Sequence, residues 1–194
     1  ARVDVVEKDS VLTSPLPGYP GLDAPWLPDA LAFSVLLDPA VPGRLKTGAS
    51  FILSLDPKRI ERVGKQVRVG LRDVGQRAQY AAGDKLVMFA RSKGRSLVNV
   101  SASSNVVMWN IESYGTSAGH YLMVEGTDLK VLGCRELIGA GRAFGGNADG
   151  VHTRANVLGP WIEGCTIEGL GDDGIAIYTK AVSIQEAPRP ATLV

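Results

Sequence analysis

The sequence predicts an all-β protein in which a small antiparallel β-barrel-like module precedes a right-handed parallel β-helix, a solenoid of short strands. Three observations lead to this fold class. The chain includes 23 Gly and 11 Pro, which favours short strands and turns over a helix bundle. Residues 66–71 alternate polar and apolar side chains, as a half-buried antiparallel strand does. After Leu97, the same pattern of apolar residues recurs from one segment to the next, which is typical of a solenoid.

The composition describes a globular chain with an almost balanced charge. Hydrophobic residues make up 45% of the chain, so it can bury a core. The 21 Lys and Arg against 20 Asp and Glu give a net charge of +1, which is no electrostatic footprint for nucleic acid or for a membrane surface. The longest apolar run, residues 30–37, is too short to span a bilayer. We therefore expect neither nucleic acid nor membrane as a partner.

The chain divides into three parts. Residues 1–48 contain most of the prolines, so we expect an extended segment that wraps a surface. Residues 49–90 contain β-branched, partly alternating stretches separated by turn residues, which predicts a small antiparallel β module. Within it, residues 57–63 are expected to be one helical turn or a hairpin link. Residues 91–194 hold the coils of the solenoid, with the β-helix itself running from Leu97 to Ile184.

Three segments of the solenoid superimpose, and they are residues 105–113, 128–136 and 159–169. Their equivalent apolar-type positions hold Val106, Met108 and Ile111, then Leu129, Val131 and Cys134, then Pro160, Ile162 and Cys165. Equivalent residues of stacked coils lie one above another at about 4.8 Å, so Ile111, Cys134 and Cys165 should form an interior column. The coil from Cys134 to Cys165 is longer than the one before it, so we expect it to carry an insertion, which we place at the Gly-rich residues 139–146.

The cysteines are predicted to be reduced and buried, because both fall in this interior column. Two cysteines and two histidines are too few for a disulfide framework or a four-ligand zinc site. Residues 139–146 lack the Lys and the strand–helix setting of a phosphate-binding loop. No metal and no cofactor is predicted.

Three carboxylates form the candidate catalytic site. Asp149 in residues 147–152 and Asp173 in residues 171–176 are one coil apart, so they should be vertical neighbours, and Asp172 adjoins both. A lone Asp before Gly is ordinarily a turn residue. Carboxylates that share a site, however, acquire pKa values that differ from one another, as a general acid and a general base require. The alignment of both motifs in one column favours the catalytic interpretation.

Four further residues are candidates for contacts with a sugar. His152 follows Asp149 by three positions, and His120 lies one coil earlier. Arg154 would bind substrate hydroxyls, and Trp161 would stack on a sugar ring. The alternative for the two histidines is a satisfied structural role, and for Arg154 a solvated surface position.

The segment that carries these motifs, residues 147–178, resembles the active-site coils of parallel β-helix glycoside hydrolases. The pattern Asn-x-Asp-Gly, followed one coil later by Asp-Asp, is similar to that of polygalacturonases of the pectin-lyase-like fold. The chain is more similar to the bacterial exo-acting α-1,3-galactosidases of glycoside hydrolase family 110 and their uncharacterised relatives. That family also inserts a small β-barrel before its catalytic coils, as residues 49–88 are expected to do here.

The resemblance implies that Asp149, Asp172 and Asp173 are the catalytic carboxylates of an inverting hydrolysis. The implied substrate is a terminal, galactoside-like sugar on an oligosaccharide or polysaccharide, and the implied location is secreted or periplasmic. The Gly-His-Gly and Arg-x-Lys motifs with which polygalacturonases hold the uronate do not occur before Val194, so galacturonate specificity has no support. Only a few coils can be counted, so we expect a fragment of a longer solenoid, or ends covered by a partner such as a second copy.

Two other functions stay open at this level. A polysaccharide lyase on the same fold would use a basic residue or Ca²⁺-bound carboxylates to remove a proton next to a uronate. A non-catalytic β-helix would bind glycan or serve as a structural module. The sequence does not assign the acid and the base either, although direct stacking of Asp149 and Asp173 favours a shared base role, with Asp172 as the acid.

Overall fold

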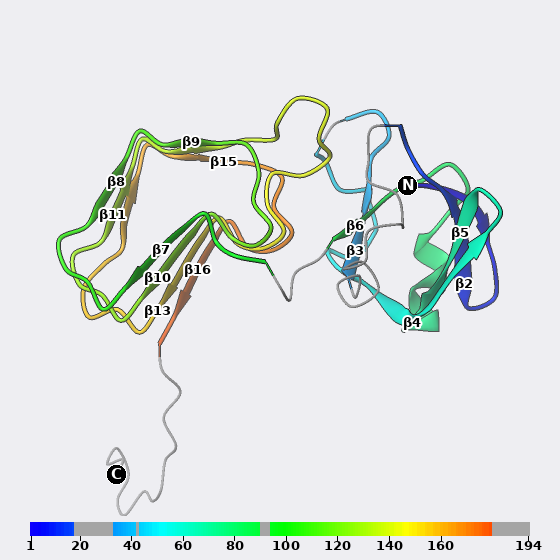
Figure 1. Ribbon diagram of the computed structural model, residues 1–194, viewed down its shortest axis with the longest axis horizontal. Helices are drawn as coiled ribbons and strands as arrows, with labels where there is room; N and C mark the ends of the chain where they lie inside the picture. The colour runs from blue at the N-terminus through cyan, green and yellow to red at the C-terminus, as the bar shows by residue number, and fades with distance from the viewer. Residues whose placement is uncertain (18–32, 42, 90–93, 180–194) are drawn as a thin grey trace, which may run out of the picture.

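The computed structural model describes residues 1–17, 33–41, 43–89 and 94–179 (Figure 1). Within these ranges the protein is all-β, as predicted, with a single 3₁₀-helix, η1 (Val74–Gln79). No helix in the described ranges has the length and the apolar character needed to cross a bilayer. The strands form a closed antiparallel barrel and three parallel sheets.

Six strands close the barrel in the order β1-β2-β5-β4-β3-β6. They are β1 (Arg2–Val6), β2 (Ser10–Ser14), β3 (Phe33–Leu37), β4 (Leu53–Val63), β5 (Gln66–Leu71) and β6 (Lys85–Phe89). Their inward side chains form one apolar core of Val3, Val11, Leu36, Leu53, Leu55, Val69, Leu71, Tyr80 and Leu86. Burying each of the larger aliphatic side chains contributes about 2 kcal/mol, so the barrel has a hydrophobic core of its own.

The antiparallel module predicted for residues 49–90 is confirmed, but the barrel is larger than that segment. β1, β2 and β3 come from residues 1–48, so the expectation of an extended loop is wrong for these three stretches. Pro15, Pro17 and Pro39, the prolines of this segment that the structure describes, lie outside the strands, which leaves each apolar or β-branched run free to pair. Residues 18–32, which hold the centre of the Pro-rich stretch, lie outside the described residues.

Residues 57–63 also differ from the expectation of a helical turn or hairpin link, because they continue β4. Pairing of β4 with β5 shifts register between Asp56 and Ile60, and Pro57 lies inside this irregularity. A proline cannot donate to the sheet ladder, so a bulge is where a strand can accommodate it. β4 therefore continues through residues 57–63, where the sequence pattern had predicted an interruption.

Three parallel sheets make up residues 98–178, which we call the three-sheet region. The first sheet contains β7 (Val98–Ser101), β10 (Tyr121–Val124), β13 (Val151–Arg154) and β16 (Ile175–Tyr178). The second contains β8 (Val107–Trp109), β11 (Lys130–Leu132) and β14 (Trp161–Glu163), and the third contains β9 (Glu112–Ser113), β12 (Arg135–Glu136) and β15 (Thr166–Ile167). Figure 1 shows the chain passing from the first sheet to the second, then to the third and back to the first.

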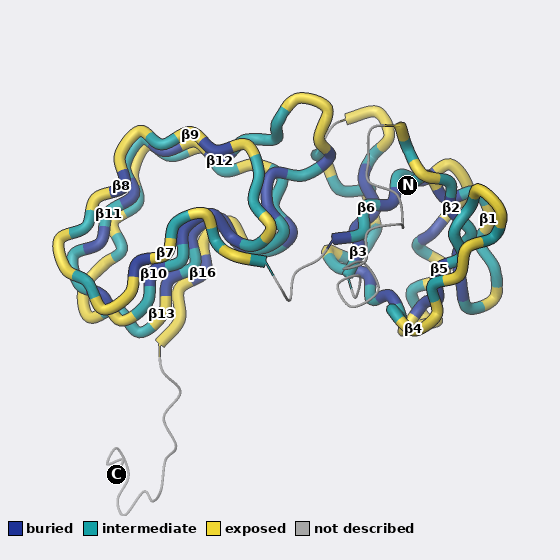
Figure 2. Tube along the Cα trace, in the orientation of Figure 1, coloured by how far each residue is buried: buried dark blue, intermediate teal, exposed yellow. Residues whose placement is uncertain are grey.

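Strand pairing confirms the register predicted for the repeats. Met108, Val131 and Ile162 are direct partners across β8, β11 and β14. Ile111, Cys134 and Cys165 immediately precede the paired residues of β9, β12 and β15, and they pack in one hydrophobic cluster. Figure 2 shows that the more buried and the less buried residues alternate along these short strands.

The corner before the third sheet repeats its backbone conformation from one level to the next. Asn110, Gly133 and Gly164 occupy equivalent positions there, with φ values of 52°, 61° and 63°. This is the left-handed region, which Gly and Asn enter most easily. The same conformation at three levels accounts for the recurrence of Gly or Asn just before the column position.

Both cysteines are free, as predicted, but their burial differs. Cys134 is buried between its neighbours in the column, whereas Cys165 is only half-buried, so the prediction of full burial is wrong for it. Cys165 lies at the last level of the column that the structure describes. β16 is likewise an edge strand among the described residues, and its inward-facing Ile175 and Ile177 are exposed. The predicted extension to Ile184 lies outside the described residues.

The long circuit of the chain contains the predicted insertion. In the first sheet, the stretch from Tyr121 to its partner Val151 is longer than the stretch from Val98 to Tyr121 or from Val151 to Ile175. The additional residues lie between β12 and β13, which includes residues 139–146. Ala143 and Phe144 from this insertion pack against the barrel, with the rings of Phe144 and Phe89 5.5 Å apart. The insertion therefore joins the three-sheet region to the barrel.

Candidate active site

The turns that enter β13 and β16 bring the three predicted carboxylates together. Asp149 lies two positions before β13, and Asp173 lies at the same interval before β16. The N–H of Gly150 donates to the carbonyl of Asp173 at 3.0 Å, so the two turns stack in the predicted register. One carboxylate oxygen each from Asp149, Asp172 and Asp173 lies within 4.8 Å of the other two. We call these three side chains the carboxylate cluster.

The three carboxylates have different environments. Asp149 is 4% exposed, Asp172 is half-buried and Asp173 is exposed. One oxygen of Asp149, Oδ1, is buried without a hydrogen-bond partner among the described residues. The cluster thus extends from the interior to the surface, and a ligand can reach it from the side of Asp173.

The separations within the cluster are shorter than the inverting hydrolysis implied by the resemblance needs. An inverting glycosidase needs carboxyl groups about 6.5 to 9.5 Å apart, and a retaining one about 5 to 5.5 Å. The oxygens found within 4.8 Å are closer than the inverting range. The nearest pair of oxygens therefore leaves little room for a water between an acid and a base.

His152 is part of this site. It lies on the outward face of β13, and its Nδ1 is 2.5 Å from Oδ2 of Asp149. Its ring also packs beside the ring of Tyr178, with 5.2 Å between centroids. His152 therefore lies beside the carboxylate cluster with Asp149 as its direct partner, and its contact with a sugar stays a prediction.

Tyr178 is a site residue that the sequence analysis missed. It pairs with Arg154 across β13 and β16, and both residues point outward. The signal was its spacing from Arg154, which equals the spacing of Asp173 from Asp149. Arg154 shares the outward face of β13 with His152, so it remains a candidate for a substrate contact.

His120 and Trp161 do not join the cluster. His120 is fully buried, and its Nδ1 is 2.7 Å from the hydroxyl of Ser113, which corrects its predicted contact with a sugar. Its backbone is at the right level, since its N–H donates to the carbonyl of Asp149, but its side chain lies inside the fold. Burial lowers the pKa of His120 and favours the neutral ring.

Trp161 begins β14 in the second sheet, so β13 and the turn that follows it separate this residue from the carboxylates. Its indole N–H donates to Glu163 at 2.7 Å. The side chain is 60% exposed, and Trp109 on the same outer face is 75% exposed. Trp161 therefore lies on the outer face of the second sheet and not beside the carboxylate cluster, so it would not stack on a sugar held by these carboxylates.

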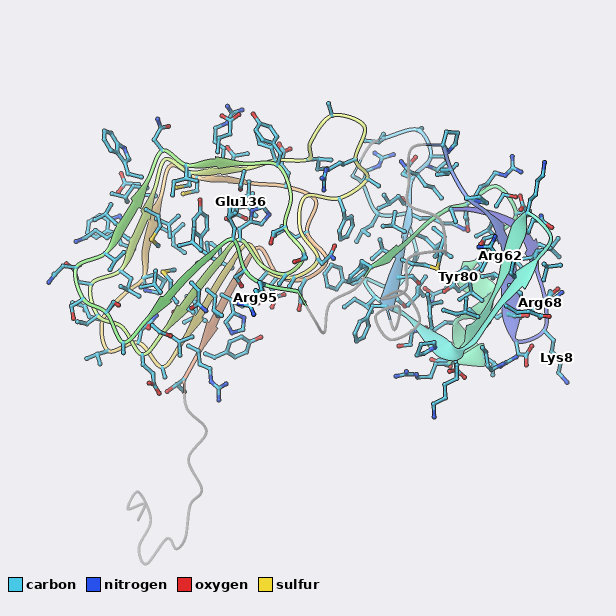
Figure 3. All side chains as sticks on the ribbon, viewed as in Figure 1. Lys8, Arg62, Arg68, Tyr80, Arg95 and Glu136 are labelled. Atoms are coloured by element: carbon cyan, nitrogen blue, oxygen red, sulfur yellow. The ribbon has the colours of Figure 1, made fainter. Side chains whose placement is uncertain are left out.

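Glu136 is a buried acid that lies against Gly150, the neighbour of Asp149 in the chain. It is 1% exposed and points inward from β12 (Figure 3). Desolvation raises its pKa to about 8, so the carboxyl group is mostly neutral at pH 7. A Cβ on Gly150 would lie 2.5 Å from Oε2 of Glu136, so this close approach needs a glycine beside Asp149. Strand alternation was the only signal, because equivalent positions hold Ser113 and Ile167.

The hydroxyl of Tyr121 is also buried near Glu136 without a partner among the described residues. Burial raises the pKa of Tyr121 far above its ordinary value. Tyr121 also packs in the same cluster as Cys134, so polar atoms of Tyr121 and Glu136 lie beside the apolar column.

The carboxylate cluster also has the donors that a hard cation takes. Ca²⁺ binds carboxylate oxygens at about 2.3 to 2.6 Å, so oxygens up to about 5 Å apart can share one ion. Asp149, Asp172 and Asp173 meet this condition. Such an ion is one of the two means by which the lyase alternative would remove a proton, the other being a basic residue.

The sequence matches no protein-family model and none of the curated proteins. The chemistry of the site therefore rests on its own geometry. That geometry offers carboxylates in two environments, a histidine held by the buried one, and an aromatic ring beside that histidine.

Proposed function

We propose that this protein is a glycoside hydrolase that cleaves a terminal, galactoside-like sugar from an oligosaccharide or polysaccharide. The observation that carries the proposal is the carboxylate cluster, in which Asp149 is buried and Asp173 is exposed. Glycoside hydrolysis needs one carboxylic acid to protonate the leaving oxygen and a base to activate water. Carboxylates that differ in burial are suited to these two roles.

The fold context supports the same proposal. We propose that the three parallel sheets are turns of a right-handed parallel β-helix of the pectin-lyase-like kind, with the barrel joined to it. The support is the parallel pairing of each strand with its equivalent on the next circuit of the chain, at an almost constant spacing apart from a single insertion. The carboxylates then lie on the turn between two faces of the solenoid, where a long polymer end can approach. A secreted or periplasmic location, as in the glycosidases it resembles, belongs to the same proposal.

In this mechanism Asp172 is the acid. It protonates the glycosidic oxygen as the bond to the anomeric carbon breaks. The base function lies on the side of Asp149 and Asp173, where a water attacks the opposite face of the sugar and inverts its configuration. Tyr178 and Arg154, on the adjoining outward face, supply a ring for stacking and a donor for sugar hydroxyls.

The test is hydrolysis of a panel of aryl glycosides and oligosaccharides with terminal galactose. Asp172→Asn should lower kcat by at least about 10²-fold, because removing a general acid commonly costs 10² to 10⁴. The matched control is Asp128→Asn, which removes a carboxylate of the three-sheet region that pairs with Lys130. Equal activity in Asp172→Asn and in the wild type would remove Asp172 as the acid, and no hydrolysis by the wild type would remove the enzyme proposal.

A chelator separates hydrolase from lyase. Activity that survives chelation, with products that lack the ultraviolet absorbance of a new double bond, excludes a Ca²⁺-dependent lyase. Loss of activity on chelation, with recovery on adding Ca²⁺, would favour the lyase and its use of the same three oxygens.

A glycan-binding function without catalysis is the second candidate, and Trp109 and Trp161 favour it. Both indoles are exposed on the outer face of the second sheet, and each offers an aromatic face together with an N–H donor. Binding to immobilised glycans that is lost in a Trp109→Ala, Trp161→Ala double variant, without any turnover, would support this function instead.

A further inference from the structure

We infer that His152 is the base that activates water and that Asp149 is a positioning residue which acts through it. The inference rests on the proposed hydrolysis and refines its base. In the structure, Oδ2 of Asp149 is 2.5 Å from Nδ1 of His152. The Asp149 side chain is 6% exposed and that of His152 is 30% exposed. Water reaches the imidazole more readily than the carboxylate behind it.

The contact fixes which ring nitrogen is available. A buried carboxylate accepts a hydrogen bond and has no proton of its own to donate, so Nδ1 of a neutral His152 carries the proton. Nε2 then presents its lone pair and can accept a proton from water. The neighbouring Tyr178 ring, 5.2 Å away between centroids, limits rotation of the imidazole out of this orientation.

The same arrangement resolves the short separations within the carboxylate cluster. Oxygens within 4.8 Å leave too little room for the water of an inverting reaction, which needs about 6.5 to 9.5 Å between acid and base. Nε2 is displaced from the carboxylate of Asp149 by the width of the imidazole ring. Moving the base from Asp149 to His152 supplies a position for the water outside the cluster.

The reaction balances with these groups alone. Nε2 of His152 takes a proton from water, and the water oxygen forms a bond to the anomeric carbon. The bond from that carbon to the leaving oxygen breaks, and Asp172 gives its proton to that oxygen. One water is consumed and two hydroxyl products form. Transfer of the proton from His152 to solvent, and from solvent to Asp172, restores the starting state.

The tautomer of His152 can be measured without any substrate. The chain has only two histidines, so ¹⁵N NMR of the imidazole nitrogens gives a simple spectrum. At a pH where the ring is neutral, we expect a protonated Nδ1 and an unprotonated Nε2 for His152. Asp149→Asn should shift this ring toward a mixture of tautomers. Ser113→Ala is the control, because Ser113 contacts His120 and should change only the signals of that residue.

Kinetics test the catalytic part on whichever glycoside the wild type hydrolyses. His152→Gln should lower kcat by about 10² to 10⁴ with KM within threefold, the range for loss of a general base. Imidazole added to His152→Gly should restore part of the rate. His120→Gln is the control and should keep kcat if circular dichroism shows it folded.

The outcomes separate the two claims. A His152→Gln variant with wild-type kcat, or an effect on KM alone, overturns His152 as the base. A protonated Nε2 in the wild type, or no change on Asp149→Asn, overturns Asp149 as its positioning residue. Absence of hydrolysis in the wild type would instead remove the proposed function, and the tautomer measurement would still decide the contact between Asp149 and His152.

Discussion

The barrel and the three-sheet region differ in how they bury polar groups. In the barrel, the buried hydroxyls of Thr13 and Ser34 donate to backbone carbonyls, at 3.1 and 3.2 Å, and among its described residues only the buried hydroxyl of Tyr80 lacks a hydrogen-bond partner. In the three-sheet region, the described residues include buried polar atoms of His120, Tyr121, Glu136 and Asp149 that have no hydrogen-bond partner. Unpaired buried polar groups cost stability. These unpaired groups therefore lower the stability of the three-sheet region relative to the barrel, whose core is largely apolar.

Substitution inside the barrel should give the largest loss of stability. Leu55 is fully buried in the apolar core, and Leu55→Ala removes its contacts and leaves a cavity. We expect a loss of about 2 to 5 kcal/mol in the free energy of unfolding, measured by urea denaturation with far-ultraviolet circular dichroism. Val5→Ala, an exposed position on the same barrel, is the control. A loss below about 1 kcal/mol for Leu55→Ala would contradict a close-packed barrel core.

The two regions also differ in how much of them the sequence could predict. The stacking of Met108 with Val131, and of Asp149 with Asp173, followed from repeat offsets, because parallel strands place equivalent residues one above another. The barrel has no repeat, and some of its strands, such as β3 and β6, pair across long stretches of chain. The prolines that follow β2 and β3 dominate the pattern of residues 1–48, and so these strands and β1 were missed.

Inside the site, offsets predicted which residues meet but not which way each side chain points. His120 and His152 lie at neighbouring levels of the same sheet edge, yet one ring lies inside the fold and the other outside. Glu136 was not predictable for a different reason. A charged residue in a short strand is exposed by default, and only the absence of a side chain on Gly150 gives this one room inside.

The polar interior should make stability depend on pH through Glu136. Its pKa of about 8 in the folded protein lies above the ordinary value of 4.5. The contribution of this group to the free energy of unfolding is therefore most favourable below about pH 4.5. That contribution is lost as the pH rises from about 4.5 to 8, at up to roughly 1 kcal/mol per pH unit. Glu136→Gln should not show this loss of stability. The unfolding free energy of the variant should therefore rise relative to that of the wild type as the pH increases.

Urea denaturation at pH 5, 6, 7 and 8 measures this dependence. Glu61→Gln serves as the control, because Glu61 is exposed on the barrel and pairs with Arg68 at the surface. Parallel pH profiles for Glu136→Gln and the wild type would show that Glu136 does not change its protonation on folding.

Gly150 should couple the polar interior to the site at a smaller energetic cost. A Cβ at this position would lie 2.5 Å from Oε2 of Glu136 and 2.6 Å from the carbonyl of Gly174. The second neighbour is backbone, so Gly150→Ala should cost about 1 to 3 kcal/mol, as overpacking does. Gly150→Ala should also lower kcat, because a shift of the backbone at Gly150 moves the preceding residue, Asp149. Gly174→Ala is the matched control, because a Cβ at Gly174 would meet no atom within 4 Å. Gly64→Ala is unsuitable, because Gly64 has a positive φ.

We therefore expect Gly150→Ala to have a clearly lower unfolding free energy than Gly174→Ala. Thermal denaturation and urea titration together measure this difference. Equal stability of the two variants would mean that the turn before β13 yields without cost. The carboxylate cluster would then not be held by the packing of Gly150 against Glu136.

The smallest effect should come from the contact that joins the two regions. The ring of Phe144 packs on Phe89 of the barrel, and one of its edge carbons lies 3.0 Å from where a Cβ on Gly171 would be. An aromatic pair contributes about 0.5 to 1.5 kcal/mol beyond the area it buries, and Phe144→Leu keeps most of that area. We expect a loss of about 1 kcal/mol. Gly171 precedes Asp172, so the same substitution loosens the turn that carries the acid.

The informative quantity in Phe144→Leu is thus the ratio of its effects on stability and on kcat. If the barrel only adds stability, kcat stays at the wild-type value while the unfolding free energy falls. If the insertion also holds the Asp172 turn, kcat falls severalfold at a temperature where circular dichroism shows the variant fully folded. Phe33→Leu is the comparison, because Phe33 stacks on the same Phe89 ring at 6.3 Å but lies in β3 of the barrel. Equal kcat in the two variants would show that the barrel does not position the carboxylate cluster.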